Sequence, residues 1–332
     1  MRVISVLFIA STISLVMADR AHTQNSNDVK SAINKSIPLL QSVGVPFIEN
    51  TGCASCHHNV LPAMATATAR EHGFKVDDRI RREQLKKMLS WIEAGREKML
   101  QGVGIPGDAT TASYALLGLA ADKYPADEKT DALVHYVLGK QAADGRWQPV
   151  AYRPPIEYSD FTTTAITARA IQLYAPKGRA VEIGKRVARA REWLVKATPV
   201  TSEERAYRLL GLFWSRATNH EVEQAAESLL AQQRPDGGWS PITTLPSDAY
   251  ATGQALFALA QAGVLRTNDA AYQRGVNYLL KTQLGDGSWF VQTRAIGFQR
   301  YFESGFPHGR SQFISAAGTS WATLALALSV AP

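Results

Sequence analysis

The sequence predicts an all-α protein built from repeated pairs of helices. Three segments share a pattern in which a glutamine stands four residues before a glycine and six residues before a tryptophan. They are Gln141–Trp147, Gln233–Trp239 and Gln283–Trp289. A run of small and apolar residues follows each one. Repetition of this kind indicates units that each bury an apolar face against their neighbours.

Within each repeat, a first amphipathic helix is expected to end at the glutamine. The Asp-Gly or Gly-containing turn that follows allows a positive φ angle, which glycine adopts without a steric penalty. The tryptophan can then bury its ring against the next helix pair while its N–H finds an acceptor. Residues Arg189–Leu194 resemble a degraded fourth copy, in which Thr198 replaces the glutamine.

The second helix of each unit is predicted to lie inside a covering layer. These helices are apolar nearly all round, which suits an inner ring; they are Thr110–Ala121, Thr162–Tyr174, Glu203–Trp214, Ala249–Gly263 and Thr319–Val330. Asp108, Asp160 and Asp248 stand at or near the start of three of them. We expect these aspartates to be helix N-caps, with a catalytic role as the alternative.

The pattern Arg-Gly-x2-aromatic-Leu (Arg274–Leu279) followed by Gln-x3-Gly-x-Trp is similar to the QW repeat of squalene and oxidosqualene cyclases. Related repeats occur in protein prenyltransferase β subunits. The resemblance covers residues 100–330. It implies an α/α toroid of about six inner and outer helix pairs around an apolar cavity, and activities on isoprenoid chains.

The catalytic sets of these families do not carry over. The cyclases protonate their substrate through an Asp-x-Asp-Asp acid, and this sequence contains no such tetrad. The prenyltransferases bind zinc through an Asp, a Cys and a His late in the chain, whereas both cysteines here lie near the N-terminus. The resemblance therefore implies the fold without its chemistry.

The first unit, residues 28–73, carries a different turn. Its first helix is expected over residues 28–42, with Val29, Ile33, Ile37 and Leu40 on one face, and its second over about 61–72. Between them stands Cys53-Ala-Ser-Cys56-His57, which is the attachment motif of c-type haem. Cys53 and Cys56 would hold one haem c covalently and His57 would be the proximal ligand. A disulfide or redox pair, or a zinc site with one or two histidines, remains open.

The last unit has a long loop from about Phe290 to Ser315 between its two helices. In a closed ring of six pairs this loop lies beside the cysteine segment. Loops of this length in a compact fold are commonly functional. We expect His308 to be the distal haem ligand, with Met64 and His58 as weaker candidates. Arg294 and Arg310 are candidates to pair with haem propionates.

The N-terminus predicts export. Arg2, the apolar run Val3–Met17 and small residues near Ala18 form a signal peptide over residues 1–18. A disordered lead over 19–27 and a single domain over 28–332 follow. The mature protein is therefore expected in the periplasm or outside the cell. The net charge of +7 is scattered, which argues against nucleic acid but leaves membrane-surface association open.

Three functions compete on these grounds. The first is a periplasmic c-type haem protein for electron transfer or haem redox chemistry, with a redox partner and a hydrophobic or isoprenoid ligand in the cavity. The second is a terpenoid cyclase or prenyltransferase-like enzyme without haem, which would use Asp108, Asp160 or Asp248. The third is a non-catalytic lipid-binding or interaction toroid, stapled by a disulfide or zinc. The haem motif favours the first.

Overall fold

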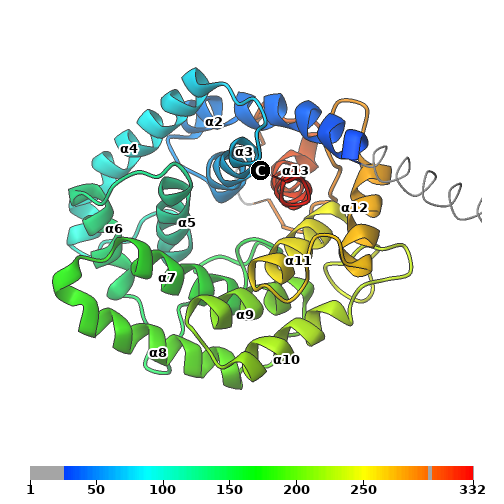
Figure 1. Ribbon diagram of the computed structural model, residues 1–332. Coiled ribbons are helices and arrows are strands. Elements are labelled where there is room, and N and C mark those ends of the chain that lie inside the picture. The colour runs from blue at the N-terminus through cyan, green and yellow to red at the C-terminus, as the bar shows by residue number, and fades with distance from the viewer. Residues whose placement is uncertain (1–25, 298–300, 332) are drawn as a thin grey trace, which may run out of the picture.

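In the computed structural model, which describes residues 26–297 and 301–331, the chain forms two concentric rings of helices (Figure 1). The inner ring contains α3 (Leu61–Glu71), α5 (Asp108–Ala121), α7 (Asp160–Tyr174), α9 (Ser202–Trp214), α11 (Ala249–Gln261) and α13 (Gln312–Leu328). Each inner helix packs against the next, and α13 packs against α3 to close the ring.

The outer ring covers the inner one. It contains a helix over residues 26–42 continued by α2 (Gly44–Thr51), then α4 (Asp78–Leu100), α6 (Glu128–Leu138), α8 (Ala180–Lys196), α10 (Asn219–Leu230) and α12 (Ala270–Thr282). Short helical turns lie at η1 (Cys56–Val60), η2 (Lys177–Arg179) and η3 (Gly309–Ser311). The predicted toroid of six helix pairs is confirmed.

The two rings differ as their sequences predict. The outer helix α8 buries Ile183, Val187, Ala190 and Leu194, which repeat at helical spacing along one face. The inner helix α13 is buried from Ile314 to Ala327 on every side. Alanine, glycine, serine and threonine fill much of this helix, so that neighbouring inner helices approach closely. Gly253 of α11, for example, faces the backbone of Trp321, where a Cβ atom would come within 2.5 Å.

Each glutamine–tryptophan turn clasps one unit to the next. Trp147, Trp239 and Trp289 are fully buried, and their Nε1 atoms donate to the carbonyl oxygens of Val137, Leu229 and Leu279 at 2.6–2.9 Å. The glutamine amides donate both to the glycine carbonyl of their own turn and to a carbonyl of the next outer helix. The predicted tryptophan burial and N–H partner are confirmed.

The same clasp closes the ring. Gln283 Nε2 donates to Gly287 O at 3.0 Å and to Ala32 O at 2.9 Å, which joins the last unit to the first outer helix. Gly287 has a φ of 90°, and a Cβ atom there would lie 2.7 Å from the backbone of Lys35. Glycine is therefore required by both the turn and the close approach.

The fourth unit has lost the clasp, as its sequence indicates. The connection over residues 197–201 is short, and Thr201 caps α9 in a reciprocal capping box with Glu204. The guanidinium of Arg208 takes over the role of the indole N–H, because it donates to the carbonyl oxygens of Leu194 and Val195 at 2.9 and 3.0 Å.

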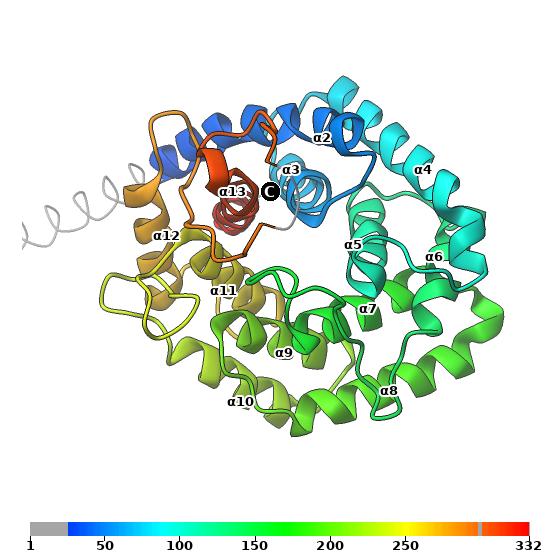
Figure 2. The ribbon, with the colours of Figure 1, turned by 180° about the vertical axis from the view of Figure 1, so that it is seen from behind.

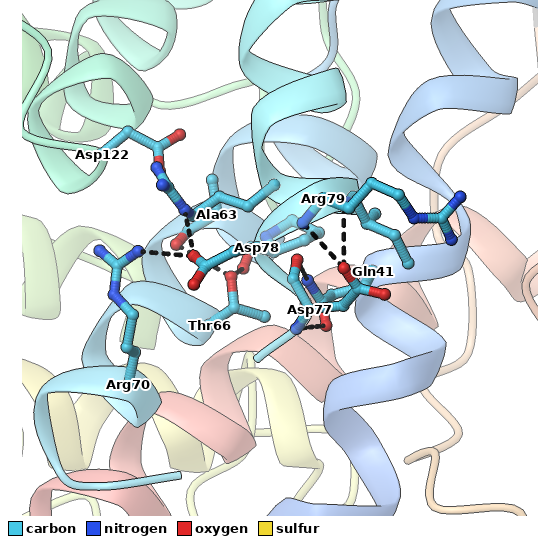
Figure 3. A network of polar contacts seen from close by, with 11 residues as sticks. Gln41, Ala63, Thr66, Arg70, Asp77, Asp78, Arg79 and Asp122 are labelled. Atoms are coloured by element: carbon cyan, nitrogen blue, oxygen red, sulfur yellow. Dashed lines mark hydrogen bonds and ion pairs between the residues drawn. The ribbon is translucent and has the colours of Figure 1, made fainter. Parts of the chain in front are cut away.

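At the end of the rings opposite the glutamine–tryptophan turns, a polar network joins the first two units (Figure 3). Arg81 bridges Asp78 and Asp122 at 3.0 and 3.1 Å, and Arg70 also reaches Asp78. Gln41 exchanges two hydrogen bonds with the backbone of Asp77. The network fixes the inner-to-outer connection that leads into α4.

The predicted signal peptide, residues 1–18, lies outside the described residues, as does most of the predicted lead over 19–27. None of the helices within residues 26–297 and 301–331 combines the length and apolar character needed to span a bilayer.

Replacing Gln283 by alanine removes its hydrogen bond to Ala32 O, which joins the last unit to the first, and its hydrogen bond to Gly287 O within its own turn. We expect the free energy of unfolding to fall by about 1–3 kcal/mol, because two carbonyl groups lose their donor. Gln232→Ala, at the end of α10 and outside the clasp, serves as the matched control in urea unfolding. Equal stabilities of the two variants would contradict a closing role for Gln283.

Candidate active site at the mouth of the inner ring

The six inner helices begin at the same end of the toroid, which we call the mouth. Figure 2 looks onto this end, where the outer-to-inner connections emerge. Because the inner helices run parallel, the positive ends of their dipoles converge there. Polar groups that precede or begin these helices are therefore brought together from segments far apart in the sequence.

Three connections meet at the mouth: the cysteine segment 52–60, the connection 148–159 and the long loop 283–311. His58 Nε2 lies 2.8 Å from Ser304 Oγ, which joins the long loop to the cysteine segment. Arg153 is in electrostatic range of His57, and Arg294 of Tyr158. The prediction that the long loop lies beside the cysteine segment is confirmed.

Glu203 is a buried carboxyl group at the start of α9. Its side chain is 3% exposed, and it accepts hydrogen bonds from Thr162 Oγ1 at 2.9 Å and from Gln254 Nε2 at 3.0 Å. These partners come from the two neighbouring inner helices, α7 and α11. The carboxyl group is thus held between three inner helices, with both of its oxygens hydrogen-bonded.

Burial raises the pKa of Glu203 to about 7. Hydrogen bonds from Gln254 and Thr162, the nearby hydroxyl group of Tyr250 and the positive charge of Arg294 act in the opposite direction but do not cancel the desolvation. The acid form of Glu203 is therefore favoured below about pH 7. A neutral carboxylic acid in a desolvated position is suited to donate a proton.

Tyrosine rings lie next to this acid. Tyr114 and Tyr207 join their hydroxyl groups at 2.8 Å across the ring, from α5 to α9, and both side chains are buried. Tyr250 of α11 is also buried and lies close to Glu203. Cys56 is in electrostatic range of all three tyrosines, which places the cysteine segment beside the same group of aromatic residues.

The aspartates at the helix starts divide into three cases. Asp248 caps α11 by accepting from Ala251 N–H at 2.8 Å, as predicted, and burial raises its pKa to about 6. Asp160 is not the cap of α7, because Ser159 takes that position and Asp160 pairs with Arg146. Asp108 is not a cap either: it follows Gly107, at the start of α5, and accepts from Tyr136 Oη at 2.8 Å.

The cysteine segment forms a π-helical turn, Cys56–Val60, a geometry found frequently at functional sites. Ser55 caps this turn by accepting from His58 N–H, and Asn59 ties it to the carbonyl of Gly44. The His57 ring stacks on Phe313 at 5.1 Å and meets Phe47 edge to face. Burial, helped by Arg153, lowers the pKa of His57 to about 3.

Both thiols are free, and burial raises the pKa of Cys53 and of Cys56. A raised pKa keeps a thiol protonated and unreactive. Across the described ranges, histidine, cysteine, aspartate and glutamate side chains form no group of three or more placed to hold a metal ion.

The other predicted site residues lie apart from His57. His308 Nε2 pairs with Ser288 Oγ at 2.8 Å, and its ring contacts Phe290 and Phe306. Arg310 is exposed, and Met64 packs against the core. The positive charge of Arg294 lowers the pKa of both Glu203 and Asp248. Arg294 is thus near enough for its charge to lower the pKa of Glu203, whereas His308 bonds to Ser288 and not to His57.

Sequence reasoning missed Glu203, because it sits within an ordinary helix start. Its neighbour Glu204 fills the capping box, which gives a pair of acidic residues a conventional explanation. The available signal is positional: Glu203 begins an inner helix on its buried side, whereas Glu204 and Arg205 of the same helix are partly exposed.

Comparison with known proteins agrees with the fold. The chain is 29% identical to the squalene–hopene cyclase of Bradyrhizobium diazoefficiens over 224 residues, which is 56% of this chain and 34% of that protein. A probable squalene–hopene cyclase of Sinorhizobium fredii is 28% identical over 217 residues, 54% of this chain and 33% of that one. The chain thus spans about a third of the length of these relatives. No family model matches it.

Solved structures match along nearly the whole chain. A variant of the type II terpene cyclase MstE from Scytonema, in complex with the substrate geranylgeranyl dihydroxybenzoate, has a TM-score of 0.62 at 16% identity and covers 93% of this chain and 99% of its own. Another MstE variant, in complex with the product merosterolic acid A, has a TM-score of 0.57 at 16% identity, covering 92% and 97%. These matches establish the squalene-cyclase-like α/α toroid.

The prediction of a c-type haem protein is wrong. The relatives and the structural neighbours that carry an activity in their names are cyclases of isoprenoid chains, which is the second of the three functions. The five-residue motif misled because it occupies the outer-to-inner turn of the first unit. There His57 and His58 pack within a cluster of phenylalanine rings and bond to each other and to Ser304.

The raised pKa of Glu203 makes stability depend on pH. The folded state keeps this proton up to about pH 7, whereas the unfolded chain releases it near 4.5. The contribution of Glu203 to the free energy of unfolding is therefore fully present below about pH 4.5. As the pH rises through 7, the protein loses about 3 kcal/mol of stability from this group. The Glu203→Gln variant has no carboxyl group at this position, so its free energy of unfolding should not show this fall between pH 4.5 and 8. Parallel stability profiles of the two proteins between pH 4.5 and 8 in urea unfolding would contradict the raised pKa.

Proposed function

We propose that this protein is an acid-initiated cyclase of isoprenoid chains, with Glu203 as the proton donor. The observation that carries the proposal is a buried carboxyl group with a raised pKa, held between inner helices of a cyclase-like toroid next to buried tyrosines. This combination supplies what the missing Asp-x-Asp-Asp tetrad supplies in the cyclases that the sequence resembles.

The chemistry follows from the geometry. Glu203 transfers its proton to one carbon of a C=C bond, which leaves a carbocation on the other carbon and a carboxylate on Glu203. A second C=C bond of the chain attacks the carbocation and closes a ring. The faces of Tyr114, Tyr207 and Tyr250 carry negative charge density, which stabilises a nearby cation by about 0.5–2 kcal/mol per contact.

The substrate class is supported by the neighbours. MstE binds geranylgeranyl dihydroxybenzoate and merosterolic acid A, an isoprenoid substrate and its product. That protein matches the present chain over 99% of its own length, so a single toroid of this size accommodates such a ligand in MstE. We therefore propose an isoprenoid of comparable length in place of the longer relatives' squalene.

Glu203→Gln removes the acidic proton while keeping the size and the hydrogen-bonding atoms of the side chain. We expect the conversion of geranylgeranyl dihydroxybenzoate or squalene, measured by mass spectrometry, to fall by about 10²–10⁴-fold. Glu204→Gln is the matched control, because this neighbouring carboxylate bonds the backbone N–H groups of Val200 and Thr201 outside the ring. Equal losses in both variants would contradict the assignment.

The reaction rate should also depend on pH. The acid form of Glu203 is lost as the pH rises through about 7, so turnover should decline above neutral pH and be retained below it. The measurement is the rate at saturating substrate between pH 5 and 9. A rate that rises with pH through this window would overturn the role of Glu203 as the donor.

A further inference from the structure

A chain of hydrogen bonds determines which nitrogen of His57 carries a proton. The chain begins at Gln312, the first residue of α13, which is fully buried. Its Nε2 donates to Phe302 O at 2.9 Å, so its Oε1 must be the atom that accepts from Ser304 N–H at 2.7 Å. The orientation of the amide is therefore fixed by two backbone groups.

The fixed orientation of the Gln312 amide determines where the hydroxyl hydrogen of Ser304 points. Its hydroxyl contacts the same Gln312 Oε1, an atom that can only accept, so the hydroxyl proton points toward Gln312. The oxygen of Ser304 accepts from Phe306 N–H at 3.3 Å. It is left with one lone pair for His58 Nε2, 2.8 Å away. His58 Nε2 must consequently carry a hydrogen.

The two histidines complete the chain. Burial lowers the pKa of His58 well below its usual range, so His58 is neutral and its Nδ1 has a lone pair. His57 Nδ1 lies 2.6 Å from that atom and must be the donor. In neutral His57 the hydrogen is thus on Nδ1, and Nε2 carries the lone pair. Among residues 26–297 and 301–331, no hydrogen bond is made to that Nε2, and His57 as a whole residue is partly exposed.

His57 and Glu203 lie at the starts of different inner helices. His57 lies immediately before α3, and Glu203 begins α9. In the closed order α3, α5, α7, α9, α11, α13, these two helices are opposite members, so the acid and the imidazole lie on opposite sides of the mouth. Tyr114, Tyr207 and Tyr250 are in electrostatic range both of Glu203 and of Cys56, the residue before His57.

We propose that His57 Nε2 is the base that ends the reaction by removing a proton from the cyclised cation. This inference rests on the proposed function. One C–H bond of the cation breaks, its electron pair forms the C=C bond of the product, and the proton moves to His57 Nε2. Glu203 has given one proton and His57 receives one, so the product is an isomer of the substrate.

The surroundings of His57 suit this role. A carbocation is a strong acid, so a weakly basic imidazole is sufficient to deprotonate it, and a weak base releases its proton readily afterwards. Phe313 and Phe47 hold the ring by stacked and edge-to-face contacts at 5.1 and 5.2 Å. Ser304 and Gln312 are positioning residues, because they act only through the orientation of the two imidazoles.

The first test compares products of the wild-type protein and of His57→Gln. Without the base, the cation survives longer and is captured by water or loses a different proton. We expect the ratio of cyclic alcohols and isomeric alkenes to the main cyclic alkene to rise about tenfold or more, while substrate consumption persists. His308→Gln is the matched control. His308 lies in the long loop that meets the cysteine segment, but it pairs with Ser288 and not with His57 or His58.

A second pair of variants tests the hydrogen-bond chain itself. Ser304→Ala removes the acceptor of His58 Nε2–H and should shift the product ratio in the same direction. Ser304→Thr keeps the hydroxyl and should restore the wild-type ratio. A purely structural role for Ser304 would change stability and rate without changing the product ratio, so that result would overturn the assigned relay.

The tautomer has a readout that does not depend on activity. The ¹⁵N chemical shifts of His57 in the full chain should show a protonated Nδ1 and a non-protonated Nε2, and Ser304→Ala should mix the two tautomers. The opposite tautomer in the wild-type protein would overturn the inference. If the wild-type protein cyclises its substrate and His57→Gln gives unchanged products, the base is wrong but the function stands. If no isoprenoid is converted, the proposed function fails.

Discussion

The clasp between a glutamine, a glycine and a tryptophan is the interaction on which the rest of the structure depends. Each glutamine joins its own turn to the next outer helix, and the buried tryptophan seals the end of the outer helix it follows. The bond from Gln283 to Ala32 closes the series into a ring. Three of the six outer-to-inner connections carry this clasp, and because all six connections lie at one end of the ring, all the inner helices begin there.

That common end creates the chemistry. Glu203, at the start of α9, is surrounded by α7 and α11 rather than by water, and this desolvation raises its pKa. The same ring closure carries the long loop of the last unit onto the turn of the first, where Ser304 meets His58. Glu203, the rings of Tyr114, Tyr207 and Tyr250, and His57 thus come together from four of the helix pairs.

The sequence predicted the architecture well because the repeat is local and redundant: three copies of one turn and five apolar helices indicate a ring without any long-range information. It also placed the long loop beside the cysteine segment. It failed at Glu203, whose significance comes from residues on α7 and α11, and it overvalued Cys53-Ala-Ser-Cys56-His57. A short motif does not reveal that its histidine packs against Phe47 and Phe313.

The most direct test of the account is turnover in heavy water. If a carboxyl group that exchanges with solvent starts the reaction, wild-type protein given geranylgeranyl dihydroxybenzoate in D₂O should form a cyclic product with a single deuterium on carbon. That deuterium should sit at the site of initial protonation, found by mass spectrometry and NMR. A cyclic product with no deuterium on carbon, or the recovery of unchanged substrate, would contradict the account.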